Sequence, residues 1–123
     1  MSNPFNLSAA EMIDVALKTF EKGQYNAAQL IIEQAIILDN TNIDAKLCYF
    51  KILVATGGNR SIYDYKSNKA KAVNLHRELK KAIDNKEIEF NEFQQQQYRE
   101  AIINYVQFIE FIDNAENQFY NPF

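Results

Sequence analysis

The sequence is poor in the residues that a β-sheet protein needs at its turns. Its 123 residues include three glycines and two prolines, and the prolines, Pro4 and Pro122, lie next to the two ends. Glycine and proline form most tight turns, and proline also interrupts helices, so their scarcity leaves a long central stretch compatible with helix. We therefore predict an all-α fold. The length and a hydrophobic fraction of 47% suit one domain, residues 1–123, with its own core.

Residues that carry chemistry are equally scarce. The chain has one cysteine, Cys48, and one histidine, His76. They cannot form an internal disulfide or a Cys/His metal site, and His76 lies at the edge of an apolar helix face, as a half-buried structural histidine does. Gly57-Gly58 is typical of a helix stop and not of a phosphate loop. No group of residues combines nucleophile, base and oxyanion donor, so we predict no catalytic residues, no cofactor and no metal, in a protein that is not an enzyme.

Long apolar runs are also missing. No stretch approaches the ~20 apolar residues of a membrane span, and no basic segment followed by an apolar one opens the chain. The surroundings of Cys48, Leu-Cys-Tyr-Phe, suggest a buried reduced thiol. We expect a cytoplasmic protein, or a component of an intracellular particle such as a virion, without contact to a membrane and not secreted.

What the sequence does contain is helical periodicity. Ser8 and Glu11 form a capping box, Leu7 and Met12 stand at the spacing of a hydrophobic staple, and Gly23 suits a helix C-terminus. Apolar residues then recur at helical spacing, which predicts hairpins at 8–38 and 42–84 and a long helix at about 90–119. An inserted loop is expected at 57–67. The positions expected to face the core are Met12, Val15, Ala16, Phe20, Ala28, Ile32, Ala35, Leu38, Leu47, Phe50, Val54, Ala72, Leu75, Leu79, Phe93, Ala101, Tyr105, Phe108 and Ile112.

Residues 9–42 resemble a tetratricopeptide repeat, an antiparallel helix pair of about 34 residues. The residues that carry this resemblance are the apolar and small residues Met12, Val15 and Ala16, the turn Gly23-Gln24-Tyr25, and Ala28, Ile32 and Ala35. The proline that usually closes such a repeat is absent. Residues 43–84 look like a degenerate second repeat, and the last helix would act as its cap.

The resemblance implies a protein–protein interaction or scaffold module. In tetratricopeptide proteins the first helix of each pair lines a concave groove, so the resemblance implies that Asp14, Lys18, Lys46 and Tyr49 face a bound peptide. With barely two repeats, this groove would be short.

The net charge of −3 conceals an uneven distribution. Residues 60–86 carry eight basic and three acidic residues, whereas residues 87–123 carry one basic and seven acidic residues. A basic face on the fourth helix comprises Lys66, Lys69, Arg77, Lys80 and Lys81. It either binds phosphates or an acidic protein, or is a solvated face turned toward the acidic last helix. We regard nucleic acid as the less favoured partner, since no aromatic residue lies among the lysines to stack on a base.

Two further surfaces are candidates for partner binding. Arg60, Tyr63 and Tyr65 in the expected loop are residue types enriched at binding hot spots, and they could equally fold back over the bundle. Ile103, Val106 and Phe111 make the apolar arc of the last helix wider than one hairpin can cover. Either this helix runs through the middle of the bundle, or part of it is an interface. The second alternative predicts a self-associating structural subunit, for example of a phage ring or connector, with the chain itself or other subunits as partners.

The tripeptide Asn-Pro-Phe occurs at both ends of the chain, at 3–5 and 121–123. It resembles the ligand of EH domains. The two phenylalanines are also compatible with docking against the protein's own core.

Overall fold

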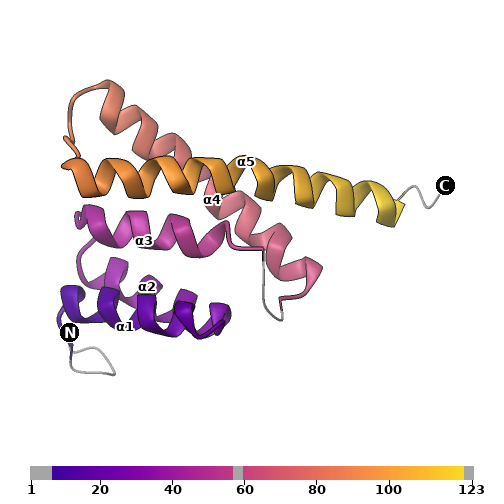
Figure 1. Ribbon diagram of the computed structural model, residues 1–123, viewed down its shortest axis with the longest axis horizontal. Coiled ribbons are helices and arrows are strands. Elements are labelled where there is room, and N and C mark those ends of the chain that lie inside the picture. Colours follow the sequence, from indigo (N-terminus) through magenta and orange to yellow (C-terminus); the bar gives the residue numbers. More distant parts are fainter. Residues whose placement is uncertain (1–6, 57–59, 121–123) are drawn as a thin grey trace.

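The structure is a computed structural model that describes residues 7–56 and 60–120, with only the backbone of 118–120. These residues form five helices and no strand, as predicted (Figure 1). The helices are α1 (Ala9–Glu21), α2 (Tyr25–Leu38), α3 (Ile43–Leu53), α4 (Ile62–Asp84) and α5 (Glu92–Tyr120).

The local signals at the first helix act as predicted. The Ser8 hydroxyl accepts from the Glu11 amide at 3.2 Å, and the Glu11 carboxylate accepts from the Ser8 amide at 3.1 Å, so two open backbone donors are satisfied. Gly23 ends the helix with φ of 80°, a conformation that glycine adopts without a Cβ clash. Ala16 and Ala28 are completely buried, which lets α1 and α2 pack closely.

Helix α3 is the centre of the fold. It contacts each of the other four helices, and its residues belong to both hydrophobic clusters of the core. One cluster joins α3 to α1 and α2, and includes Met12 and Ile32. The other joins α3 to α4 and α5, and includes Phe50 and Phe108. Figure 1 shows α1, α3 and α5 stacked in front, with α4 crossing behind α5 and the C-terminal part of α5 extending past the other helices.

The predicted loop at 57–67 is wrong over its second half. Ser61 caps α4, which begins at Ile62, because its hydroxyl accepts from the Asp64 amide while the Asp64 carboxylate accepts from the Ser61 amide. This second capping box starts the helix six residues before the predicted boundary at 68.

Three residues expected in the core are exposed. Val15 lies at the edge of the face that α1 turns to its neighbours, and Leu38 is the last residue of α2. Phe93 is 68% exposed in the first turn of α5. The core side of this end is filled by Phe90 and Tyr98 instead, whose rings lie 5.4 Å apart.

Candidate interaction surfaces

Arg60 is buried and not available for partner binding. It is 8% exposed, and its guanidinium donates to the carbonyls of Ile52 and Tyr25 at 3.2 and 3.3 Å and to the Gln29 side chain at 3.3 Å. These acceptors belong to α3 and α2, so Arg60 holds the start of α4 against both helices. Burial lowers the pKa of this guanidinium.

The two tyrosines of the predicted loop face opposite ways. They are two positions apart on one helix, about 200° around the axis, so only one can point into the bundle. Tyr65 is buried, donates its hydroxyl to the Thr56 carbonyl at 3.1 Å and meets the Phe111 ring edge-on at 5.1 Å. Tyr63 is 75% exposed and remains a candidate contact residue. Of the two alternatives, Arg60 and Tyr65 therefore follow the second, folding back over the bundle, and are not exposed binding residues.

The residues expected along one peptide groove lie on different sides of the molecule. Asp14 and Lys18 form an exposed ion pair with each other on α1, at 2.9 Å. Lys46 is mostly covered and forms an ion pair with Glu78 of α4, and Tyr49 donates to Glu33 of α2 at 2.8 Å. Lys46 and Tyr49 thus face α4 and α2, so the four residues do not line a common groove.

A polar trench runs between α2 and α4. The side-chain amides of Gln29 and Asn68 donate to each other at 3.0 and 3.1 Å, and the Glu33 carboxylate accepts from Tyr49 and Lys71. Burial, followed by the neighbouring Glu33, raises the pKa of Tyr49. These polar groups satisfy one another, so the trench joins two helices and offers few open hydrogen-bonding groups to a ligand.

The basic face of α4 is partly turned to acidic residues of the same chain. Lys69 pairs with Asp113 of α5 at 3.0 Å, which agrees with the interpretation of a face turned toward the acidic last helix. Lys80 pairs with Asp84 one turn away at 3.4 Å. The side chains of Lys66, Arg77 and Lys81 are exposed.

His76 and Cys48 are both packing residues. The imidazole stacks on the Tyr105 ring at 4.7 Å, and burial together with nearby Lys80 lowers its pKa. The Cys48 thiol lies in the cluster formed by α1, α2 and α3, and burial raises its pKa to about 12. Such a thiol is a poor nucleophile. Across residues 7–56 and 60–120, no three His, Cys, Asp or Glu side chains are grouped so that they could hold a metal ion.

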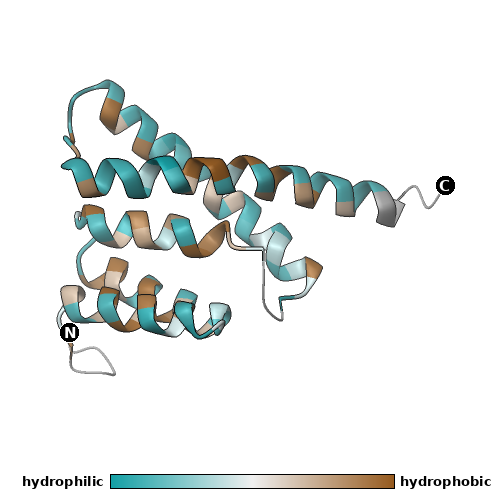
Figure 2. Ribbon diagram, in the orientation of Figure 1, coloured by the Kyte–Doolittle hydropathy of each residue, from teal (hydrophilic) through white to brown (hydrophobic). Residues whose placement is uncertain are grey.

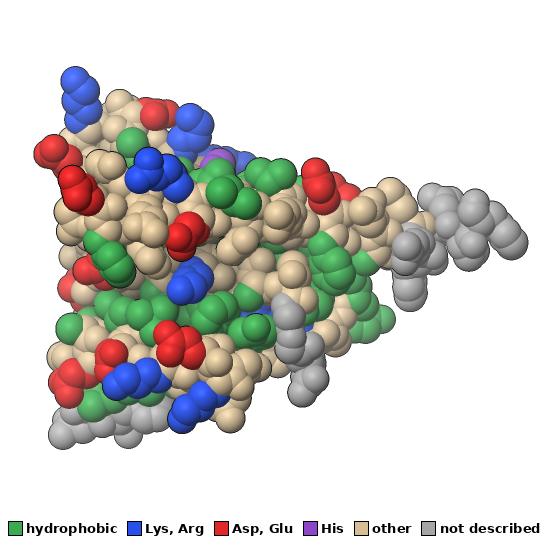
Figure 3. Space-filling model, in the orientation of Figure 1, with side chains coloured by type: hydrophobic (Ala, Val, Ile, Leu, Met, Phe, Trp, Pro, Cys, Tyr) green, Lys and Arg blue, Asp and Glu red, His purple; other side chains and the backbone are tan. Residues whose placement is uncertain are grey.

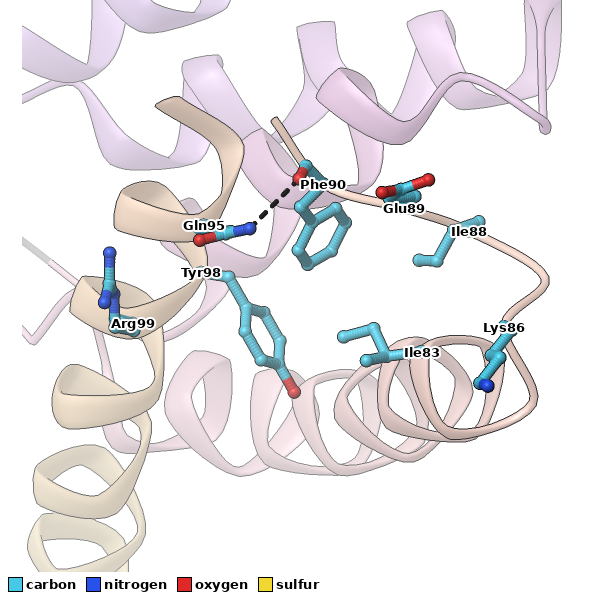
Figure 4. Close-up of a pocket in the computed structure, with 8 residues that line it drawn as sticks. All are labelled: Ile83, Lys86, Ile88, Glu89, Phe90, Gln95, Tyr98 and Arg99. Carbon is cyan, nitrogen blue, oxygen red and sulfur yellow. Dashed lines mark hydrogen bonds between the residues drawn. The ribbon is translucent and has the colours of Figure 1, made fainter. Parts of the chain in front are cut away.

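The turn between α4 and α5 contains a pocket of about 590 Å³ that the sequence did not indicate. Figure 4 shows Ile83, Ile88, Phe90 and Tyr98 pointing toward one another around its centre, with Lys86 on the turn and Arg99 on the far side of α5. Gln95 donates to the Phe90 carbonyl at 3.1 Å and fixes the entry to α5. The pocket can accept an apolar group at this end of the molecule.

Large apolar side chains are exposed on α2, where Leu30 is 65% and Ile37 72% exposed, and on α5. Ile103 is 59% and Val106 52% exposed, although Phe108 on the opposite side of the same helix is completely buried. We call Arg99, Ile103, Val106 and Glu110 the outer face of α5, because at 100° per residue they lie within about 60° of one another. Figure 2 shows the hydrophobic stretch in the middle of α5, and Figure 3 shows hydrophobic side chains at the upper edge there, between a basic and an acidic group.

Among the described residues, no helix combines the length and the apolar character that crossing a bilayer requires. The two Asn-Pro-Phe tripeptides, at 3–5 and 121–123, lie outside the described residues. No protein-family model, no curated protein and no solved structure matches this chain.

Proposed function

We propose that this chain is a non-enzymatic, tetratricopeptide-like interaction module and that the outer face of α5 holds its protein partner. The observation that carries the proposal is the exposure of Ile103 and Val106 on a helix whose other side is part of the core. Clustered apolar side chains on a surface mark interaction sites, and a charged rim such as Arg99 and Glu110 is typical of them.

The order of helix contacts supports a tetratricopeptide-like build. Helix α3 contacts both helices of the hairpin before it, and α5 likewise contacts α3 and α4. An array in which each hairpin packs on its neighbour has contacts in this order. The buried small residues Ala16, Ala28 and Ala35 occupy the positions that the resemblance assigns to close helix packing.

The surroundings of His76 and Cys48 support the absence of chemistry. The His76 imidazole stacks on the Tyr105 ring between α4 and α5, and the Cys48 thiol is buried and protonated. Both side chains therefore contribute to packing. The basic face offers less support for nucleic-acid binding, because Lys69 and Lys80 already have carboxylate partners.

Site-specific photo-crosslinking tests the proposal. Ile103 is replaced by benzoylphenylalanine in the full chain, and Asp14, exposed on α1, is replaced in the same way as the matched control. We expect defined protein adducts, in the purified sample or in extract of the source organism, from position 103 and not from position 14. The adducts should vanish when Val106→Asp is added. Equal, weak labelling from both positions would refute the proposal.

A further inference from the structure

The outer face of α5 is self-complementary. Its apolar centre is Ile103 and Val106, and a charged residue stands four positions outside each of them, Arg99 before and Glu110 after. If a second α5 lies antiparallel so that Ile103 meets Val106 of the other copy, the same two-fold axis brings Arg99 opposite Glu110. A parallel pair would instead place like charges together.

We infer that the partner of this face is a second copy of the chain, bound through an antiparallel α5–α5 contact. This rests on the proposed function, which it deepens by naming the partner. A symmetric pair uses the same patch twice, so every attractive contact is formed twice. Within the described part of the chain, Arg99 and Glu110 are exposed and form no ion pair, so each is available to the other copy.

The charged residues of α4 that lie beside the outer face of α5 also fit an antiparallel α5–α5 pair. Helix α4 runs antiparallel to α5, since Lys69 meets Asp113 and His76 stacks on Tyr105. The C-terminal half of α4, with Arg77 and Lys80, therefore lies beside the N-terminal half of α5.

In the symmetric pair, the acidic C-terminal half of the second α5 comes to this place. A cleft between α4 and α5 borders the contact. Its charged residues are Arg77, Lys80 and Lys81 and one carboxylate, Asp84, which pairs with Lys80. Opposite charges, Arg99 and Glu110, thus meet at both ends of the apolar centre.

Charge exchange tests the pairing. Sedimentation equilibrium of the full chain, from 10 µM to 1 mM in low salt, should show a monomer–dimer equilibrium. Arg99→Glu and Glu110→Arg should each weaken the dimer at least tenfold, because each places like charges opposite one another. An equimolar mixture of the two variants should associate again, since every cross-pair is then attractive, and the double variant should dimerise like the wild type.

Lys22→Glu and Glu21→Arg, which make the same charge changes at exposed positions near the end of α1, serve as matched controls and should leave the dimer unchanged.

Several results would overturn the inference. One is a wild type that stays monomeric up to 1 mM; another is a mixture that stays monomeric although circular dichroism shows both variants folded. Loss of association by Leu30→Asp with Ile37→Asp in a folded variant would also overturn it, because that result places the contact on α2. If the purified chain is monomeric but position 103 still crosslinks to another protein, the proposed function survives and the inference fails.

Discussion

Removal of Arg60 tests how the middle of the bundle is held together. Its guanidinium forms three hydrogen bonds, to the carbonyls of Ile52 and Tyr25 and to the side chain of Gln29. Arg60→Met keeps most of the aliphatic stem and removes all the donors. Each such bond contributes about 1 kcal/mol net, so the loss is roughly 3 kcal/mol before compensation.

Two features reduce this figure. The Ile52 carbonyl also accepts from the Ala55 amide at 3.3 Å, so it keeps a partner. Burial of the guanidinium is itself unfavourable: it lowers the pKa of Arg60, and Nε has no hydrogen-bond partner among the described residues. Removing the guanidinium also removes its desolvation cost. If this gain offsets the contribution of about one hydrogen bond, Arg60→Met should lower the free energy of unfolding by about 2 kcal/mol. For a chain of this length, that lowers Tm by roughly 8 °C.

Urea and thermal unfolding followed by circular dichroism at 222 nm measure the change, with Lys22→Met as the exposed control. Arg60→Lys should not rescue stability, since one ammonium group cannot reach acceptors on two helices as the forked guanidinium does. A variant Arg60→Met as stable as the wild type would show that the desolvation cost of Arg60 equals or exceeds the contribution of its bonds.

Three further predictions concern the core and its titratable groups. Phe108→Ala should cost about 3–5 kcal/mol of unfolding free energy in urea, and Ile103→Ala less than about 1 kcal/mol; equal costs would contradict the placement of the core. Cys48 should resist thiol reagents at pH 8 until the chain unfolds. Because its folded pKa is raised to about 12, its contribution to stability is present below pH ~9 and lost above it, and Cys48→Ala should remove that alkaline loss. His76 has a lowered pKa, so its contribution is present above the unfolded pKa of about 6.5 and lost as the pH falls through the folded value; His76→Phe should keep the stacking on Tyr105 and remove this dependence in pH-stepped urea titrations.

The helices could be predicted because their signals are local. The capping box of Ser8 and Glu11, the positive φ of Gly23 and the apolar stripes each depend on residues within a few positions. The start of α4 carries the same kind of signal in Ser61 and Asp64. Aspartate in the third position departs from the usual glutamate or glutamine of this motif, which makes the helix start harder to recognise in the sequence.

The burial of polar residues could not be predicted in this way. Arg60 finds its acceptors 8 and 35 positions earlier in the chain, and Gln29 pairs with Asn68 across 39 positions. These contacts exist only after α2, α3 and α4 have been placed next to one another. An arginine followed closely by two tyrosines indicates residue types that are common at binding hot spots, but it does not show which carbonyls will cover the arginine.

The outer face of α5 is an intermediate case. The sequence shows that α5 has a wide apolar arc. The width alone does not tell whether other helices pack on both sides of α5 or on one side only. The contacts with α3 and α4 make that distinction, and they leave Ile103 and Val106 open. Arg99 and Glu110 stand at equal distances from the apolar pair, a signal that the sequence contains but that becomes meaningful only when the exposed face is known.

The energy of the inferred dimer follows from the same residues. Ile103 and Val106 of two copies, each already about half buried, gain about 1 kcal/mol apiece when covered, or roughly 4 kcal/mol in all. This only matches the lower end of the ~4–15 kcal/mol that association costs. The net affinity must therefore depend on the two Arg99–Glu110 pairs, and it should fall steeply between 50 and 500 mM salt because such exposed charges are screened. An association that kept its strength at high salt would place the binding energy in apolar surface elsewhere, such as that around Leu30 and Ile37 on α2.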